Sequence, residues 1–259
     1  MTISRDRLER FARRQRLDIT PDNGNQVIRY LAVTRRWRVW GFIGGVIGSQ
    51  LFAPPGTIVK VDFVTIFAGW FVGALVAEVR VSHLAYGSIR TASLQPRRAQ
   101  RYVRGFAWAL VPASAGVALA VAAATFVAGL AGWADPAWPW AAAWLAVALA
   151  VAGGVWTIQH AVLRRPQPLA AADVIEADDA IRSRSLHVLC GGGAALVLFL
   201  VFNQLGALHP TEPAADQIIA AVRLIGVFVV TALGWGVATS VWPASGTDLR
   251  AGAPAVGAV

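Results

Sequence analysis

Two groups of polar side chains interrupt long apolar runs in this chain, and they are the residues best placed to do chemistry. A polar group in hydrocarbon is costly and usually serves a function, so each is a candidate site residue. From their depth in the runs we expect an outer polar cluster near one side of a membrane and an inner polar cluster near the other. The outer polar cluster comprises Gln50, Asp62, Asn203, Gln204 and Arg223, and the inner one comprises Glu78, Gln159 and His160.

Arg223 is the costliest of these residues, because it lies about five residues, or roughly 8 Å along a helix, inside an apolar run. Its guanidinium could snorkel to the outer headgroups, or it could pair with Asp62 and line an outward cavity. Asp62 and Glu78 lie about 24 Å apart along one helix, so they cannot share a site but could mark two mouths of a path. For the inner polar cluster, solvation at the interface is the alternative. No charge lies at the centre of a run, which argues against an ion-coupled carrier.

Signatures of catalysis are absent from the sequence, which has no GxxxxGK[ST] phosphate loop, no GxSxG elbow and no HExxH pair. The single cysteine, Cys190, excludes an intramolecular disulfide and a thiolate-rich zinc site. An acidic patch is interpreted as a solvated helix face that pairs with Arg182, and it comprises Asp173, Glu176, Asp178 and Asp179. We therefore predict no catalytic residue, no cofactor and no metal site, and we expect that the chain is not an enzyme.

Long apolar runs must hold these residues in place. The chain has 259 residues, of which 56% are apolar and 14% charged, against about 25% charged in a soluble domain. A helix of about 20 residues crosses the hydrocarbon core and satisfies its own backbone. The sequence thus predicts an all-α, polytopic integral membrane protein with six transmembrane helices. The expected spans are residues 37–53, 61–79, 103–131, 140–163, 186–208 and 218–242.

The distribution of basic residues predicts the orientation of these spans. Of the 23 Lys and Arg residues, 21 lie in the two terminal segments and in the loops after the second and fourth spans. Such a bias places these segments in the cytoplasm, so both termini are expected there. The bias also accounts for the pI of 11.2 without nucleic-acid binding. The tryptophans agree, with Trp37, Trp40, Trp108 and Trp242 near the inner interface and Trp133, Trp138 and Trp140 near the outer one.

The chain is thus expected to form three hairpins, each preceded by a cytoplasmic amphipathic segment. Residues 1–36 form the cytoplasmic N-terminal segment, 37–242 the transmembrane domain and 243–259 a disordered cytoplasmic tail. A helix over residues 4–16 would lie on anionic lipid or dock a partner. The GxxxG pairs Gly44–Gly48 and Gly69–Gly73 predict close helix packing, and three consecutive glycines at 191–193 predict a kink.

The length, the six spans and the cytoplasmic helices are similar to the membrane subunit of an ABC-2-type exporter. This resemblance rests on topology, and it implies a separately encoded ATPase that docks on the arginine-rich loops. The alternative is a non-transporting scaffold, assembly factor or sensor anchor whose loops bind a cytosolic protein. We expect the chain in a bacterial inner membrane, where it contacts anionic lipid at the cytoplasmic face and could form a homo-oligomer. We expect no nucleic acid among its partners. The residues expected to dock a partner or lipid are Arg97, Arg98, Arg101, Arg164 and Arg165.

Overall fold

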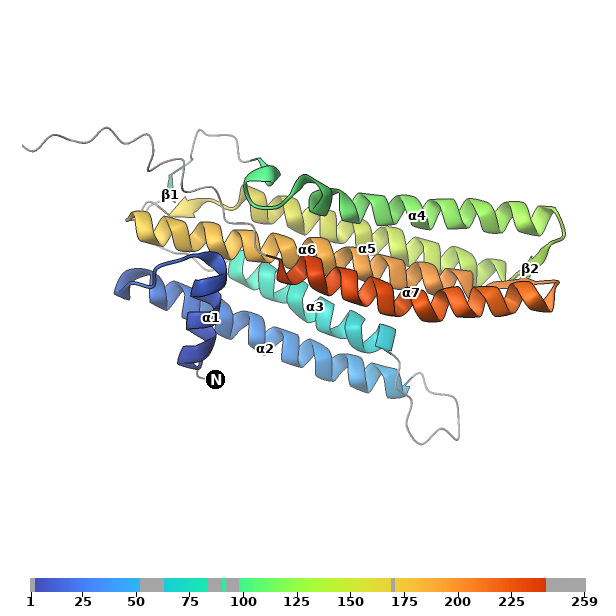
Figure 1. The fold of residues 1–259 in the computed structure, drawn as a ribbon, viewed down its shortest axis with the longest axis horizontal. Helices are drawn as coiled ribbons and strands as arrows, with labels where there is room; N and C mark the ends of the chain where they lie inside the picture. The colour runs from blue at the N-terminus through green and yellow to red at the C-terminus, as the bar shows by residue number, and fades with distance from the viewer. Residues whose placement is uncertain (1–2, 52–62, 83–89, 92–97, 169–170, 241–259) are drawn as a thin grey trace, which may run out of the picture.

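The computed structural model describes residues 3–51, 63–82, 90–91, 98–168 and 171–240, and nearly all of them are helical. Asp62, Arg97 and the expected tail at 243–259 lie outside the described residues. The helices are α1 (Arg5–Gln15), α2 (Pro21–Leu51), α3 (Phe63–Ser82), the short 3-10 helix η1 (Ala99–Arg101), α4 (Gly105–Leu130), α5 (Trp138–Arg164), α6 (Ala172–Leu205) and α7 (Pro213–Thr239). Figure 1 shows α2 to α7 side by side along one long axis, with α1 across the start of α2.

Five of these helices, α3 to α7, are long and apolar enough to cross a membrane. The count of six is not confirmed. The run expected to be the first span is the last part of α2, and Arg35, Arg36 and Arg38 around its start lower the apolar character of that helix. The amphipathic segments before the first and fifth expected spans run into those spans without a break, since α2 begins at Pro21 and α6 at Ala172. The helix expected at residues 4–16 is confirmed as α1.

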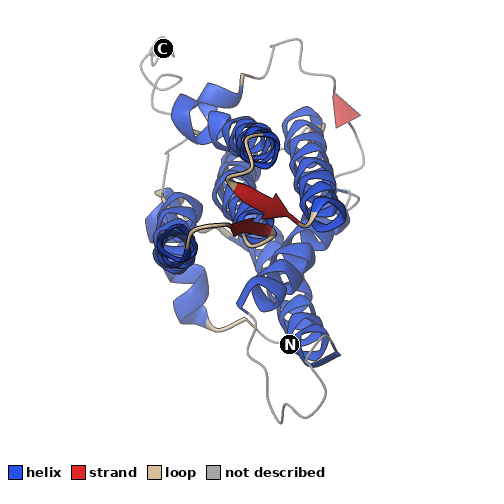
Figure 2. Ribbon diagram, turned by 90° about the vertical axis from the view of Figure 1, so that its right-hand side faces the viewer, coloured by secondary structure: helices blue, strands red, loops and turns tan. Residues whose placement is uncertain are grey.

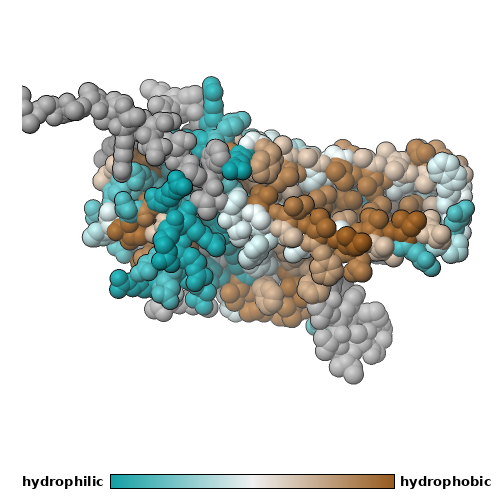
Figure 3. Space-filling view, in the orientation of Figure 1, coloured by the Kyte–Doolittle hydropathy of each residue, from teal (hydrophilic) through white to brown (hydrophobic). Residues whose placement is uncertain are grey.

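The apolar surface is that of a protein embedded in lipid. On the face shown in Figure 3, a broad apolar belt covers the helices, and hydrophilic residues gather at the end that carries α1. The side chains of α7 illustrate it, because Leu224, Phe228, Leu233 and Trp235 are 64% to 69% exposed. Monomeric soluble proteins do not expose an apolar face of this extent. We call the end of the bundle that carries α1, η1 and the start of α6 the basic end, and the opposite end the far end.

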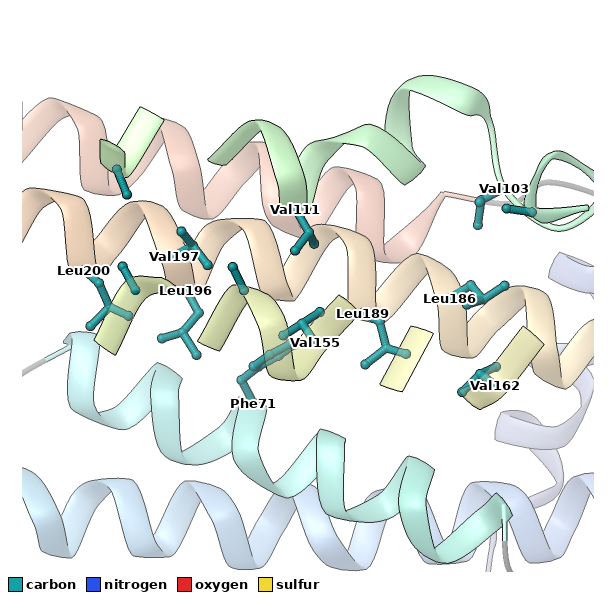
Figure 4. Packing of buried hydrophobic residues seen from close by; sticks show 14 of the residues in the cluster. Phe71, Val103, Val111, Val155, Val162, Leu186, Leu189, Leu196, Val197 and Leu200 are labelled. Atoms are coloured by element: carbon teal, nitrogen blue, oxygen red, sulfur yellow. The ribbon is translucent and has the colours of Figure 1, made fainter. Parts of the chain in front are cut away.

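Helix α6 occupies the centre of the bundle, where it packs against α2, α3, α4, α5 and α7. The three consecutive glycines lie on its different sides. A Cβ atom at Gly191 would lie 2.4 Å from the Gly234 carbonyl oxygen of α7. One at Gly192 would lie 2.6 Å from the Phe71 ring of α3, and one at Gly193 would lie 2.7 Å from Val155 of α5. Helix α6 runs without interruption from Ala172 to Leu205, and these glycines permit the close approach of three neighbours. Figure 4 shows core residues of this helix, among them Leu189 and Leu196, together with core residues of the neighbouring helices.

Helices α2 and α3 form an antiparallel pair with backbones in direct contact. A Cβ atom at Gly41 would lie 2.2 Å from the Gly69 carbonyl oxygen, and one at Gly73 would lie 2.2 Å from the Trp37 carbonyl oxygen. The predicted role of Gly69 and Gly73 is thus confirmed. On the first helix the prediction is only partly met, because Gly48 lies against Thr65 of α3 while Gly44 faces open space. The closest backbone contacts are instead made by Gly41 and Gly45.

Two short β-ribbons tie the loops together. At the far end, β2 (Ala134–Pro136) pairs antiparallel with β4 (Leu208–Pro210), so the α4–α5 loop is joined to the α6–α7 loop. Both strands lie at the centre of the end-on view in Figure 2. At the basic end, β1 (Arg90–Thr91) pairs with β3 (Gln167–Pro168), which joins the α3–α4 loop to the α5–α6 loop. Each ribbon thus joins two loops that lie more than 70 residues apart in the sequence.

The glycine contacts give a direct test of the α2–α3 interface. Replacing Gly41 with Ala should destabilise the protein by about 1–3 kcal/mol, because the new methyl group meets the backbone of α3. This change corresponds to a melting temperature lower by on the order of 5 °C in detergent. Gly44→Ala is the matched control. It adds the same methyl group three residues further along α2, where nothing is within 4 Å. Equal effects of the two substitutions would contradict the observed register.

Candidate functional site

The start of α6 carries a group of buried charges that we call the buried ion network. It links α6 to the end of α5 and to the segment at residues 98–104. Asp178, Asp179 and Arg182 are 1%, 6% and 0% exposed, although all three are charged side chains. Their partners are Arg165 at the end of α5 and Arg101 and Tyr102 at η1. The network lies at the basic end.

Arg182 closes the C-terminus of α5. Its Nη1 donates hydrogen bonds to the carbonyl oxygens of Val162, Leu163 and Arg165, at 2.8, 2.9 and 3.0 Å. The last carbonyls of a helix have no partner within the helix, and they carry the negative end of its dipole. The buried Arg182 guanidinium therefore supplies both hydrogen-bond donors for these carbonyls and a positive charge beside the negative end of the dipole. Its Nη2 donates to the Asp178 carboxylate at 2.7 Å.

Asp178 and Asp179 each accept bonds from two sides. Asp178 also receives a hydrogen bond from Arg165 at 2.5 Å, so this carboxylate lies between two buried guanidinium groups. Asp179 receives bonds from Arg101 and from the Tyr102 hydroxyl, both at 3.0 Å. Charge-assisted hydrogen bonds of this kind are short and strong. The pair of aspartates thus fixes α5 and the η1 segment to the same turn of α6.

Other polar groups bond α6 to the end of α7, to the η1 segment and to the segment before α2. Arg184 donates to the Ala238 carbonyl oxygen at the end of α7, and Ser183 donates to the Tyr102 carbonyl oxygen at 2.8 Å. Near the start of α6, Thr20 donates to the Asp173 carboxylate, which joins the segment before α2 to α6. The first four turns of α6 therefore contact the segment before α2, the end of α5, the η1 segment and the end of α7.

The sequence-based interpretation of the acidic patch is corrected here. Asp178 does pair with Arg182 four residues later. The solvated face is confirmed only for Glu176, which is exposed, because Asp178 and Asp179 are buried and Asp179 pairs with Arg101 rather than with Arg182. The error arises because neighbouring elements enclose α6 from Ala177 onward.

Two of the arginines expected to dock a partner are used inside the protein. Arg165 is 8% exposed and bound to Asp178, and Arg101 is bound to Asp179. Arg98 and Arg164 are exposed on the surface of the basic end. Arg97, the fifth, lies outside the described residues. Among the five, Arg98 and Arg164 are thus the described residues whose side chains are exposed.

The inner polar cluster is only partly assembled. Glu78 is 2% exposed, and its carboxylate lies in the electrostatic field of Arg38 and Arg184, next to the Ser185 hydroxyl. Neither carboxylate oxygen has a hydrogen-bond partner of normal geometry among the described residues. Tyr30, which the sequence did not single out, contacts the same hydroxyl at 3.4 Å. Glu78 thus belongs with Tyr30 and Ser185 at the junction of α2, α3 and α6.

Gln159 and His160 have other surroundings. Gln159 is fully buried, and its Nε2 lies 3.3 Å from the Cys190 sulfur of α6. His160 is half-buried and packs against Trp108 and Trp156, with ring centroids 5.4 and 4.6 Å away. Its Nδ1 lies 2.9 Å from the Trp156 carbonyl oxygen of its own helix. Adjacent residues on α5 therefore face different neighbours, and His160 belongs to an aromatic group.

The outer polar cluster is not a single site either. Gln50 is exposed at the end of α2, which Figure 1 shows well apart from the far ends of α6 and α7. Asn203 donates to the Phe199 carbonyl oxygen at 3.2 Å, within its own helix. Gln204 is 1% exposed, and its Oε1 has no partner among the described residues. Asp62, the expected partner of Arg223, lies outside the described residues.

Arg223 has a contact that neither sequence interpretation anticipated. Its guanidinium lies over Gly206, the C-terminal cap of α6, where a Cβ atom would be 2.7 Å from its Cζ and Nη1. A cation in this position is stabilised by the negative end of the α6 dipole. Arg223 on α7 thus relates to the end of α6 as Arg182 and Arg184 on α6 relate to the ends of α5 and α7. The signal in the sequence was a glycine just after an apolar run.

Comparison of the chain with protein-family models, with curated proteins and with solved structures finds no match. The class of protein therefore rests on the structure, which is helical with several apolar helices suited to a multi-pass membrane protein. The charged groups of the buried ion network are paired with one another or with helix ends. Their contacts hold α5, α6 and the η1 segment together.

Asp178 can be tested as the residue that makes the network stable. Asp178→Asn should destabilise the protein by about 3–5 kcal/mol, because Arg165 and Arg182 would then be buried without a counter-charge. Thermal unfolding in detergent should show a melting temperature lower by on the order of 10 °C. Asp22→Asn removes an exposed carboxylate at the same end and should change stability by less than about 0.5 kcal/mol. A destabilisation as small as that of Asp22→Asn would show that the ion pairs of Asp178 with Arg165 and Arg182 are not needed for folding.

Two buried phenols predict instability at alkaline pH. Burial, reinforced by the Asp179 carboxylate, raises the pKa of Tyr102 to about 12, and burial with the nearby Glu78 raises the pKa of Tyr30 to about 12. Their ordinary pKa is 10.0, so the unfolded chain loses these protons first, and stability should fall as pH rises from about 10 to 12. Phenolate absorbance with Tyr30→Phe and Tyr102→Phe variants would assign each titration. Phenolate signals from both residues near pH 10 in the folded protein would refute this expectation.

Proposed function

We propose that the chain is the membrane-embedded subunit of a transport system, with a topology similar to that of an ABC-2-type exporter. In this proposal α2 is a sixth crossing beside α3 to α7, both termini lie in the cytoplasm, and the membrane is a bacterial inner membrane. The alternating direction of α2 to α7 along one axis in Figure 1 supports this arrangement. The chain would take its energy from a cytosolic ATPase encoded separately.

The buried ion network is the observation that carries the proposal. Desolvation of buried charges is expensive, and apolar residues of similar volume would often stabilise a fold as well. A network of this kind instead specifies one arrangement of the elements that it joins. Here it joins the surface that bears Arg98 and Arg164 to the central helix through Arg101 and Arg165. A partner bound to that surface would thus act on α6 directly.

The alternative is a scaffold, assembly factor or sensor anchor. The observation that favours it is the enclosure of α6, because 89% of the most apolar 18-residue stretch of this helix is buried. Helix packing of this density within one copy leaves a transport path between copies, so the transport proposal includes a homo-oligomer. A scaffold needs neither an oligomer nor an ATPase, and this difference separates the two functions.

Charge reversal at the exposed arginines tests the transport proposal. The wild-type chain, purified from its native membrane in mild detergent, is expected to bring down an ATPase. The double variant Arg98→Glu/Arg164→Glu should reduce the recovered ATPase activity by at least about tenfold, since both changes introduce repulsion at the docking surface. Arg13→Glu/Arg16→Glu is the matched control, because it makes the same change of charge at exposed positions around the end of α1.

Each outcome of this experiment favours one function. A chain that copurifies with no ATPase, and that supports no nucleotide-dependent movement of solute in vesicles, would refute the transport proposal and leave the scaffold. Equal loss of the ATPase in both double variants would show that general basicity, and not the surface around Arg98 and Arg164, holds the partner. Melting temperatures of all variants would exclude a folding defect as the cause.

A further inference from the structure

A groove between α1, α2 and α3 carries a further inference. It has a volume of about 370 Å³ and opens at the surface near the basic end. Its lining combines three arginines with apolar side chains, and it comprises Ile3, Arg7, Leu31, Thr34, Arg35, Arg38, Val39, Phe42 and Trp70. This combination of charge and apolar surface fits neither a soluble anion nor a plain hydrocarbon.

We propose that the groove is a binding site for one anionic phospholipid, with its phosphate at Arg35 and Arg38 and an acyl chain along Phe42 and Trp70. The site goes beyond a general attraction of basic residues to an acidic leaflet, because it has walls from three helices. It requires that the chain be embedded in a membrane, and it is independent of whether the chain transports anything.

The order of residues along α2 matches the polarity of a lipid. Arg35, Arg38 and Phe42 recur at helical spacing, so they share one face of α2. From Arg35 to Phe42 the helix rises about 10 Å from the basic end toward the apolar belt. A phospholipid in the leaflet at the basic end presents its charge and then its acyl chains in the same order. Phe42 is 48% exposed, and its ring lies where an acyl chain would run.

The guanidinium groups of the groove are available for a phosphate. None of the four ion pairs among the described residues includes Arg7, Arg35 or Arg38. The Arg38 guanidinium is held over the Trp70 ring at 5.3 Å, and its Nε is buried without a hydrogen-bond partner. Stacking on an aromatic ring fixes the orientation of a guanidinium while its edges stay free to bind phosphate. By contrast, Arg101, Arg165 and Arg182 of the buried ion network are already paired with carboxylates.

Native mass spectrometry of the full chain tests the site. Wild type, extracted with mixtures of phosphatidylglycerol and phosphatidylcholine, should retain one phosphatidylglycerol. Arg35→Gln/Arg38→Gln should weaken this binding by on the order of tenfold, since two charges near the phosphate are lost. Arg35→Lys/Arg38→Lys keeps the charges and should retain most of the affinity. Arg10→Gln/Arg13→Gln, which removes two exposed arginines outside the groove, is the matched control and should bind as wild type does.

Further probes separate the lipid from its parts. Inorganic phosphate and glycerol phosphate should not displace the lipid at millimolar concentration, because they lack the acyl chain that contacts Phe42 and Trp70. Displacement by either would identify a free-phosphate site and overturn the proposal. Equal retention of phosphatidylcholine, or unchanged binding in the glutamine variant, would overturn it as well. Melting temperatures in pure phosphatidylcholine would show that the glutamine and lysine variants are folded.

Discussion

Capping of helix C-termini by arginines from neighbouring helices is the interaction on which the rest of the structure depends. Arg182 and Arg184, two residues apart on α6, bind the terminal carbonyls of α5 and α7. Arg165 and Arg182 share the single carboxylate of Asp178, which leaves one positive charge in excess in a buried site. The dipole of α5, equivalent to roughly half a negative charge at its end, offsets much of that excess. Removing the helix end would therefore leave the charges unstable, and removing the charges would leave the carbonyls unsatisfied.

The same principle explains why α6 can be central. A helix enclosed on all sides needs close approach along its length and satisfied groups at both ends. Gly191 to Gly193 provide close approach to α7, α3 and α5 in turn, and Gly206 makes room for the Arg223 guanidinium at the far end. The β2–β4 ribbon then ties the hairpin of α6 and α7 to that of α4 and α5. Polar interactions thus hold the ends of the bundle, and small residues hold its middle.

Hydrophobic runs predicted the helices well, because length and composition depend only on local sequence. Position along a helix was predictable in part, since Glu78 and Gln159 lie near the C-terminal ends of α3 and α5 as expected, while Arg223 lies farther into α7 because that helix begins at Pro213. The direction in which a side chain faces was not predictable, since Gln159 and His160 are neighbours at one depth with different partners. The error at Gly44 has a similar origin, because Gly41–Gly45 and Gly44–Gly48 have identical spacing and only the position of α3 selects between them. Pairing between loops, as in β1–β3, leaves no periodic signal at all.

Arginines at the basic end therefore divide by what satisfies them, and this division links the two proposals. Those of the buried ion network are satisfied by carboxylates and a helix end, and they fix α5 and η1 to α6. Arg184 fixes the end of α7 to the same part of α6. Arg38 is oriented by Trp70 within the α2–α3 pair, and its charge acts on Glu78 and Tyr30, which lie beside Ser185 of α6. A phosphate bound at Arg38 would weaken the attraction between this arginine and Glu78. Lipid in the groove would thus act on the junction of α2, α3 and α6, while a cytosolic partner would act on α6 from the network.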